Sequence, residues 1–323
     1  MCGILGTIPS SSNHLFKHAL DTLTHRGPDD YGIENIDDEV SLGHRRLSIL
    51  DISKSGHQPM QNDDKRYTIV FNGEIYNFLE LKAELSKKGH SFRSSSDTEV
   101  LIKSYIEWGE KCVLKFNGMW AFAIWDSLKK ELFLSRDRYG KKPLFYSKQE
   151  GKFVFASEMK AIYPYLNKVE ISEDFHWMKK NIFYYESTDK CLIKGIKRFP
   201  AGHNGLYKNG ELTQVRYWNT LDHLVEVPKT YNEQVEHFRS LFLDSCKIRM
   251  RADVPIGTAL SGGLDSSATI AAMAHLSSNN NSYSDDWQHA FVAAFPGTPL
   301  DESKYAKMVT DHLGMKSTFI DIK

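Results

Sequence analysis

Residues 1–9 read Met1-Cys2-Gly3-Ile4-Leu5-Gly6-Thr7-Ile8-Pro9, an apolar run with a cysteine directly behind the initiator methionine. Glycines interrupt the run and Pro9 ends it, a pattern typical of a short buried strand. The sequence therefore predicts a buried strand that starts at the N-terminus, with Cys2 at its beginning.

The stretch that follows this strand is rich in further short strands. Residues 14–25 have the apolar spacing of an amphipathic helix, and Ser96 with Glu99 has the spacing of a capping box that opens a second helix. Strands are expected at 67–72, 120–125, 131–136, 143–146 and 152–157. Because strands outnumber helices and the turns are short, we expect a layered α+β domain of mixed or antiparallel sheets.

The pattern changes in the second part of the chain to alternating helix and strand. Asn209-Gly210 lies between two β-prone stretches and predicts a hairpin turn. Chain breakers place a domain boundary near residue 200, which predicts domains 2–200 and 201–323. The expected order is helix 232–251, strand 254–260, helix 265–276, strand 290–295 and helix 302–313, which is typical of a parallel α/β sheet.

Composition excludes several classes of protein. The 323 residues contain 41 basic and 41 acidic side chains, so no charge excess points to nucleic acid or to an anionic membrane. The sequence contains no run of about 18 apolar residues, so no membrane helix is predicted, and no secretion signal is evident. The cysteines are widely scattered, with none of the close pairs of a metal site or disulfide framework, so we expect a cytoplasmic protein without a zinc site.

Cys2 is a candidate nucleophile because of its position. The initiator methionine is normally removed before a small residue, which would leave Cys2 with a free α-amine beside its own thiol. An α-amine has a pKa near ~7.7–8.0 and can accept the thiol proton. No separate histidine base is then required.

Three further features of the first domain suit a bound amino acid. Asn72 and Gly73 could supply a side-chain amide and a backbone N–H to one developing oxyanion. Arg46 offers a fork of donors for a carboxylate, and Asp97 can hold an ammonium group. Lys141 and Lys142, which follow Gly140, are expected to form a solvated turn.

The segment Ser261-Gly262-Gly263-Leu264-Asp265-Ser266 lies between a predicted strand and a predicted helix. Glycines allow backbone N–H groups to converge on an anion, and the helix directs its positive end to the same place. The string is neither a Walker A loop nor a dinucleotide-binding loop. It predicts a phosphate site, with metal coordination by Asp265 as a possible addition.

In combination these motifs resemble the class II glutamine amidotransferases, the N-terminal-nucleophile group, in their asparagine synthetase branch. Residues 253–276 resemble the ATP-pyrophosphatase loop of the same enzymes. The strings that carry the resemblance in the first domain are Met1–Ile4, His25–Asp29, Gly43–Ile49, Phe71–Asn77, Ser96–Glu99, Gly118–Ala123, Arg136–Arg138 and Ala156–Glu158.

The resemblance implies a glutaminase domain in which two sheets lie between helices, followed by part of an α/β ATP-pyrophosphatase domain. It implies that Cys2 attacks the glutamine side-chain amide, with Asn72 and Gly73 as the oxyanion hole. The implied glutamine-binding residues are Arg46, Leu47, Ser48, Ile49, Leu50, Glu74 and Asp97.

For the second domain the resemblance implies a site for ATP and Mg²⁺. Asp265 is the implied magnesium ligand, and the implied substrates are glutamine, aspartate and ATP, which would yield asparagine, AMP and pyrophosphate. A homodimer is a further implied feature. The implied ATP-binding residues are Leu260, Ser261, Gly262, Gly263, Asp265, Ser266 and Ala293.

The second domain departs from the family pattern, because only 60 residues follow Gly263. A later acidic, glycine-containing motif and the aspartate-binding region have no counterpart, so we expect only the N-terminal part of the synthetase domain. The residues leave open whether the sequence is a fragment or a natural truncation. They also leave open a different ammonia acceptor, or a protein with glutaminase activity alone.

Overall fold

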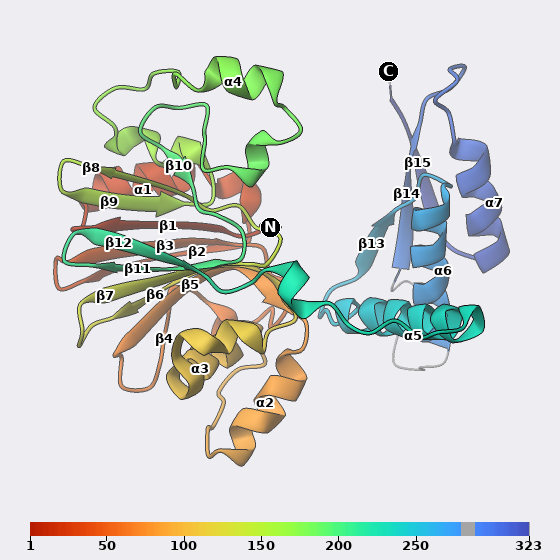
Figure 1. The fold of residues 1–323 in the computed structure, drawn as a ribbon, viewed down its shortest axis with the longest axis horizontal. Coiled ribbons are helices and arrows are strands. Elements are labelled where there is room, and N and C mark those ends of the chain that lie inside the picture. The colour runs from red at the N-terminus through yellow and green to blue at the C-terminus, as the bar shows by residue number, and fades with distance from the viewer. Residues whose placement is uncertain (279–287, 323) are drawn as a thin grey trace. The chain divides into compact units, whose positions relative to one another are not determined.

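The computed structural model describes residues 1–278 and 288–322. The chain forms two compact units, Met1–Leu224 and Val225–Lys323 (Figure 1). This division lies beyond the boundary expected near residue 200, because strand β11 (His203–Lys208) pairs with β7 (Glu131–Arg136) and so belongs to the first unit.

The first unit contains two six-stranded sheets in which every strand pair is antiparallel. The first sheet has the order β10-β8-β9-β1-β3-β2 and the second has the order β12-β11-β7-β6-β5-β4. The remaining strands are β1 (Gly3–Ile8), β2 (Asp30–Ile36), β3 (Val40–Arg46), β4 (Met60–Gln61), β5 (Tyr67–Ile75), β6 (Gly118–Asp126), β8 (Phe145–Gln149), β9 (Lys152–Ala156), β10 (Lys197–Arg198) and β12 (Glu211–Arg216).

The two sheets pack face to face, with helices on the outer faces (Figure 1). Ile4 of β1 and Val70 of β5 share the core between the sheets. The next residue along β1, Leu5, packs instead with helix α1 (Asn13–Asp21). Because successive strand residues face opposite sides, a strand covered on both faces is apolar throughout, which explains the uninterrupted run at the N-terminus.

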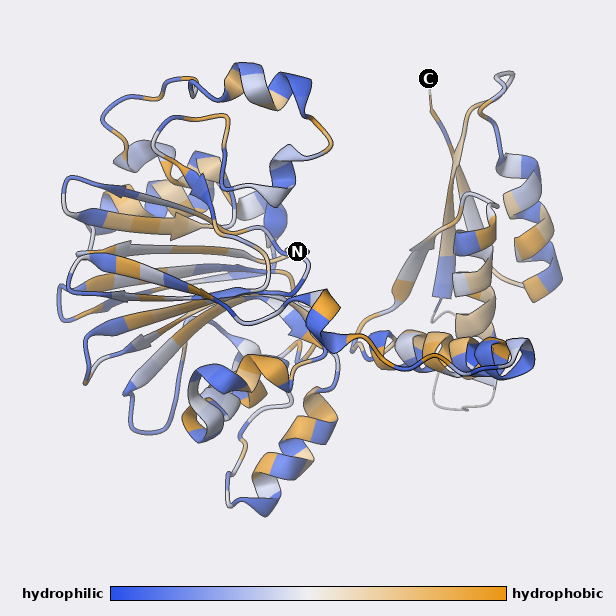
Figure 2. Cartoon of the chain, in the orientation of Figure 1, coloured by the Kyte–Doolittle hydropathy of each residue, from blue (hydrophilic) through white to orange (hydrophobic). Residues whose placement is uncertain are grey.

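Two helices cover the outer face of the second sheet and form a further part of the hydrophobic core with it. Helices α2 (Phe78–Lys87) and α3 (Asp97–Trp108) contribute Leu81 and Leu101 to a cluster with Phe122 of β6. Hydrophobic residues recur along the strands of both sheets (Figure 2). A short helix, α4 (Phe175–Lys180), lies in the segment between β9 and β10. The layered α+β architecture expected from the sequence is confirmed.

Several local expectations are confirmed and others are wrong. The Asn209-Gly210 hairpin joins β11 and β12, and both residues have the positive φ that such a turn needs. The expected helix 14–25 ends earlier, at Asp21. Ser96 caps α3 by accepting the N–H of Thr98. The prediction of a full capping box is wrong, because Glu99 accepts the N–H groups of Arg93 and Ser94 instead of that of Ser96.

The hairpin of β2 and β3 was not expected from the sequence, although it carries part of the site. The strand β3 contains His44, Arg45 and Arg46, all of them buried. Charged residues normally mark exposed positions, so a buried strand that contains them lacks the apolar signal by which strands are recognised.

The second unit contains the expected parallel sheet. Strands β13 (Ile256–Ala259), β14 (Gln288–Ala294) and β15 (Ser317–Asp321) pair in parallel in that order. Helices α5 (Tyr231–Arg249), α6 (Leu264–Ser278) and α7 (Ser303–Leu313) alternate with them. Thr230 and Glu233 form a capping box at the start of α5. Among the described helices, none has both the length and the apolar character needed to cross a bilayer.

Candidate active site

A pocket of about 270 Å³ opens beside the N-terminus of the first unit. Segments that are distant in sequence meet there: the beginning of β1, the loop after β3, the middle of β5, the start of α3 and the loop between β7 and β8. The lining residues are Met1, Cys2, Arg46, Leu47, Ile49, Leu50, Gly56, Gln58, Phe71, Asn72, Gly73, Glu74, Ser96, Asp97, Thr98, Met119, Lys141 and Lys142.

The thiol of Cys2 is held against the loop after β3. The N–H of Leu47 donates to Sγ at 3.4 Å, and the thiol lies 3.7 Å from the carbonyl oxygen of Leu47. Burial raises the pKa of the Cys2 thiol, while the Leu47 N–H and the neighbouring terminal amine lower it. Burial lowers the pKa of the α-amine, here carried by Met1. An amine of lowered pKa is more often neutral and therefore free to accept a proton.

The edge of β5 that faces the pocket presents alternate backbone groups. The N–H of Phe71 donates to Gln58 Oε1 at 2.7 Å, and the N–H of Ile75 donates to Asp97 Oδ2 at 2.9 Å. Because alternate residues of a strand direct their N–H groups to the same edge, the N–H of Gly73 points the same way, between these two. A Cβ on Gly73 would lie 2.2 Å from the Met119 carbonyl oxygen, so only glycine fits this close pairing.

The side chain of Asn72 is fully buried and lines the pocket. Neither its Nδ2 nor its Oδ1 has a hydrogen-bond partner among the described residues. Leaving a buried polar group unpaired costs about 1–3 kcal/mol, so such groups are rare unless a ligand completes them. Asn72 and Gly73 continue a strand instead of forming a turn, which places the amide and the Gly73 N–H in one rigid element.

The guanidinium of Arg46 is fixed by backbone carbonyls of the loop that follows it. Nη1 donates to Ser53 O at 2.9 Å, and Nη2 donates to Leu50 O at 3.3 Å and to Asp51 O. A Cβ on Gly56 would lie 1.9 Å from Nη2, so glycine is required for the guanidinium to occupy this place. The group remains positively charged and lines the pocket.

Two carboxyl groups, those of Glu74 and Asp97, also line the pocket. Asp97 is the first residue of α3, and burial raises its pKa to about 7, against the lowering effect of the Ile75 N–H; the neighbouring Glu74 raises it further. Burial also raises the pKa of Glu74, while the ammonium of Lys142 lowers it. A cationic ligand group between these carboxyls would favour their charged forms.

Nearly all the expected glutaminase residues therefore lie in one pocket. Ser48 does not line it; its N–H donates to Asp29 Oδ2 at 2.8 Å. Gly56 and Gln58 also line the pocket, although no motif in the sequence pointed to them. The expectation of a solvated turn is wrong for Lys142, which is only 4% exposed and lines the pocket.

The glycine loop of the second unit has the features of an anion site. Gly262 has a φ of +86°, and a Cβ there would lie 2.5 Å from the Ala306 nitrogen. The hydroxyls of Ser261 and Ser266 lie 3.0 Å apart, immediately before and within the first turn of α6. The first N–H groups of a helix lack intrahelical partners, so the loop fits a phosphate group.

Other expected ATP-site residues are less closely grouped. Asp265 is exposed in the first turn of α6, and Ala293 is exposed on β14. Leu260 instead lies in the core of the second unit. In the ranges 1–278 and 288–322, no three His, Cys, Asp or Glu side chains gather into a metal site, so Mg²⁺ coordination by Asp265 stays a prediction.

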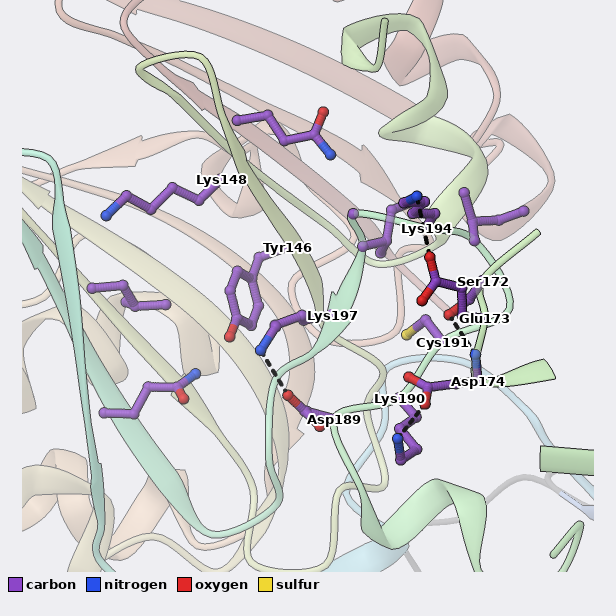
Figure 3. Close-up of a pocket in the computed structure, with 16 residues that line it drawn as sticks. Tyr146, Lys148, Ser172, Glu173, Asp174, Asp189, Lys190, Cys191, Lys194 and Lys197 are labelled. Atoms are coloured by element: carbon purple, nitrogen blue, oxygen red, sulfur yellow. Dashed lines mark hydrogen bonds and ion pairs between the residues drawn. The ribbon is translucent and has the colours of Figure 1, made fainter. Parts of the chain in front are cut away.

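A larger pocket of about 720 Å³ lies elsewhere in the first unit, between residues 172–174 and 189–197 (Figure 3). Its three carboxylates already pair with lysines of the same pocket: Glu173 with Lys194, Asp174 with Lys190 and Asp189 with Lys197. Because these charges compensate each other, the Cys2 pocket is the better candidate for chemistry.

Comparisons with known proteins agree with this site. The model of the glutamine amidotransferase domain family matches residues 1–218, and that of the asparagine synthase family matches residues 237–323. The chain is 37% identical over 337 residues to asparagine synthetase [glutamine-hydrolyzing] 3 of Bacillus subtilis, a match that covers 97% of this chain and 53% of that protein. It is 35% identical over 280 residues to asparagine synthetase [glutamine-hydrolyzing] 1 of the same organism, covering 84% and 43%.

The chain thus spans about half the length of the curated relatives it matches. Its fold is similar to that of the glutamine phosphoribosylpyrophosphate amidotransferase of B. subtilis, with a TM-score of 0.50, 16% identity, and coverage of 98% of this chain and 65% of that chain. The amidotransferase match covers about two thirds of the sequence and contains the whole Cys2 pocket. The chain therefore belongs to the glutamine amidotransferase family.

Proposed function

We propose that the first unit hydrolyses glutamine with Cys2 as the nucleophile, and that the whole protein uses the released ammonia to make asparagine. The observation that carries the first step is the buried Asn72 amide, which lacks a partner and lines the same pocket as the Cys2 thiol. A ligand carbonyl that becomes negatively charged would supply that partner.

Both ends of the amino-acid part of glutamine find a matching charge in the pocket. Arg46 would bind the α-carboxylate, and Asp97 with Glu74 would bind the α-ammonium; all three residues line the pocket. Backbone groups of residues 47–50 complete the wall. These contacts orient the side-chain amide toward Cys2, which lowers the entropic part of the barrier.

The chemical step follows from this arrangement once Met1 has been removed. The α-amine of Cys2 accepts the thiol proton, and Sγ attacks the amide carbon of glutamine. Asn72 Nδ2 and the Gly73 N–H donate to the resulting oxyanion. The C–N bond then breaks, the leaving nitrogen takes the proton, and ammonia departs from a thioester. Water hydrolyses the thioester to glutamate and restores the thiol.

The second unit would serve the ATP-dependent half of the reaction. Ser261, Gly262, Gly263 and Ser266 would hold the phosphates of ATP, with Asp265 directed to the accompanying Mg²⁺ and with Leu260 and Ala293 near the nucleoside. Bound ATP supplies the activation of the aspartate side-chain carboxylate, which ammonia then converts to asparagine. The asparagine synthase match and the names of the relatives support aspartate as acceptor.

A single substitution tests the glutaminase proposal. Glutamate release from glutamine should be lost in Cys2→Ala, after mass spectrometry has verified that Met1 is absent from both proteins. Cys246→Ala is the matched control, because Cys246 lies in the second unit, and it should retain the wild-type rate. Equal rates in wild type and Cys2→Ala would refute the nucleophile assignment.

The acceptor requires a separate test. Exchange of labelled pyrophosphate into ATP, on the protein encoded by the whole reading frame, should depend on aspartate and not on other carboxylates. If a different carboxylate supports the exchange, that compound and not aspartate is the acceptor. The four free cysteines support a reducing, cytoplasmic location, and the synthetase resemblance supports a homodimer, which sedimentation would test.

A further inference from the structure

Lys142 is a lysine buried in the wall of the Cys2 pocket. Its side chain is 4% exposed, whereas lysine is almost never fully buried unless it is paired. Among the described residues, Lys142 forms no salt bridge with a carboxylate, and the charges that act on its ammonium do so without a hydrogen bond. A buried charge without a counter-ion is costly, so an anionic group in the pocket that Lys142 lines would stabilise it.

The loop that carries Lys142 is built to hold it in this place. The buried carboxylate of Asp137 accepts the N–H groups of Tyr139, Lys141 and Lys142 at 2.9–3.1 Å. The buried guanidinium of Arg136 donates to the Lys142 carbonyl oxygen at 2.8 Å. With its backbone bonded at both ends, Lys142 has a fixed position, and only its side chain is left to extend along the pocket wall.

The charges that Lys142 meets in the pocket are those of the proposed reaction. Its pKa is lowered by burial and raised by Glu74 and by Cys2. In the same way, the ammonium of Lys142 lowers the pKa of the Cys2 thiol and that of Glu74. The effects are reciprocal because each pair of groups interacts through one electrostatic energy.

We propose that Lys142 is an electrostatic partner of Cys2. The ammonium group of Lys142 stabilises the Cys2 thiolate and the negative charge that develops on the substrate. The catalytic role of Lys142 rests on the proposed glutaminase function, but its effect on the Cys2 thiol exists without substrate. The terminal amine removes the proton, and the fixed positive charge of Lys142 favours the anion that is left behind. Lys142 transfers no proton in this scheme.

The other charged groups around Cys2 are the same in the wild type and in the Lys142 variants. A comparison of these proteins therefore isolates the effect of the Lys142 charge on the thiol. The α-amine adjoins the thiol directly before β1, and Arg26 Nε donates to the Cys2 carbonyl oxygen at 2.9 Å. The remaining charged groups that face this end of the pocket are Asp29, Arg46, Glu74, Asp97 and Lys141.

The test measures the thiol directly. Cys2 is alkylated with iodoacetamide at a series of pH values, and peptide mapping by mass spectrometry separates Cys2 from Cys112, Cys191 and Cys246. The midpoint of the rate against pH should rise by about one pH unit in Lys142→Met and stay near the wild-type value in Lys142→Arg. Lys148→Met, an exposed lysine after the same loop, should leave the midpoint unchanged.

Glutamine hydrolysis gives the second readout. At neutral pH, kcat/KM should fall about tenfold in Lys142→Met, because one pH unit reduces the thiolate fraction tenfold, and Lys142→Arg should recover most of it. If Lys142→Met does not fold, Lys142→Gln removes the same charge and carries the same expectations. An unchanged midpoint in a folded neutral variant overturns the proposal, whereas a shifted midpoint in a protein that does not hydrolyse glutamine refutes only the glutaminase function.

Discussion

The imidazole of His44 donates from Nε2 to the carbonyl oxygen of Phe71 at 3.0 Å, and so joins β3 of one sheet to β5 of the other. Phe71 directly precedes Asn72, and its N–H is bonded to Gln58. The strand that carries the unpaired Asn72 amide is thus held on the pocket side by two buried side chains. This bracing fixes the strand that carries Asn72 and Gly73, as the proposed oxyanion site requires.

The first prediction concerns His44 and acid stability. Burial lowers the pKa of His44 to about 3, while in the unfolded chain it is about 6.5. Its contribution to stability is therefore present above pH 6.5 and is lost as the pH falls from 6.5 toward 3, by about 1.4 kcal/mol per pH unit. His44→Gln keeps a donor for the Phe71 carbonyl but does not titrate. Between pH 6.5 and 4, the free energy of unfolding of His44→Gln should therefore fall by about 2–3 kcal/mol less than that of the wild type.

This difference is measurable by denaturant titration with tryptophan fluorescence, because five of the six tryptophans lie in the first unit. His14→Gln, at an exposed histidine of the same unit, is the control. Parallel curves for wild type and His44→Gln across this range would contradict the assignment of a buried neutral imidazole.

The second prediction concerns Asp97 and glutamine binding. Its pKa of about 7 means that the carboxylate form, which can bind an α-ammonium, becomes populated as the pH rises through 7. Cys2→Ala should bind glutamine without hydrolysing it, and calorimetry on this variant should show a Kd that decreases from pH 6 to pH 8. Adding Asp97→Asn should weaken binding about tenfold at pH 8 and remove the pH dependence, while the exposed Asp64→Asn changes neither. A pH-independent Kd in Cys2→Ala is the opposing result.

The third prediction separates catalysis from stability at Asn72. Asn72→Ala removes the proposed oxyanion donor, so kcat for glutamine hydrolysis should fall about 10²–10³-fold with little change in KM. Its melting temperature should not decrease, because the lost amide has no partner in the protein. Asn204→Ala, at a buried asparagine of the same sheet outside the pocket, should retain kcat. A normal kcat in Asn72→Ala would show that the amide does not meet the oxyanion.

The fourth prediction concerns the seat of Arg46. Gly56→Ala places a methyl group where Nη2 lies, so the guanidinium must move. KM for glutamine should rise about tenfold or more, with a smaller effect on kcat, because the proposed partner of the α-carboxylate is displaced. Steady-state kinetics of Gly56→Ala beside Ser55→Ala, whose side chain is exposed, provides the check. Unchanged KM in Gly56→Ala would place carboxylate binding elsewhere.

Sequence patterns predicted most of the elements that carry a regular apolar period. The parallel unit, the hairpin at Asn209-Gly210 and the strands around residues 120–136 follow directly from local chemistry, since each buries a repeating face or needs a special φ. The strand β3 and the burial of Lys142 could not be predicted in this way. Arg46 is buried because the loop after β3 supplies carbonyl oxygens to its guanidinium, and Lys142 is buried because the Asp137 carboxylate fixes the backbone of its loop.

The amino-acid order alone determined which chemical groups this protein possesses, because a cysteine behind the initiator methionine and a glycine loop before a helix have consequences that depend only on their neighbours in the chain. Only tertiary structure decided which of those groups meet. Arg46, Asn72 and Asp97 reach Cys2 because two sheets and a helix converge at the start of β1, and the unpaired state of Asn72 and the burial of Lys142 exist only after that convergence. Burial and unsatisfied hydrogen bonds depend on the packed surroundings of a group, so they arise with the fold.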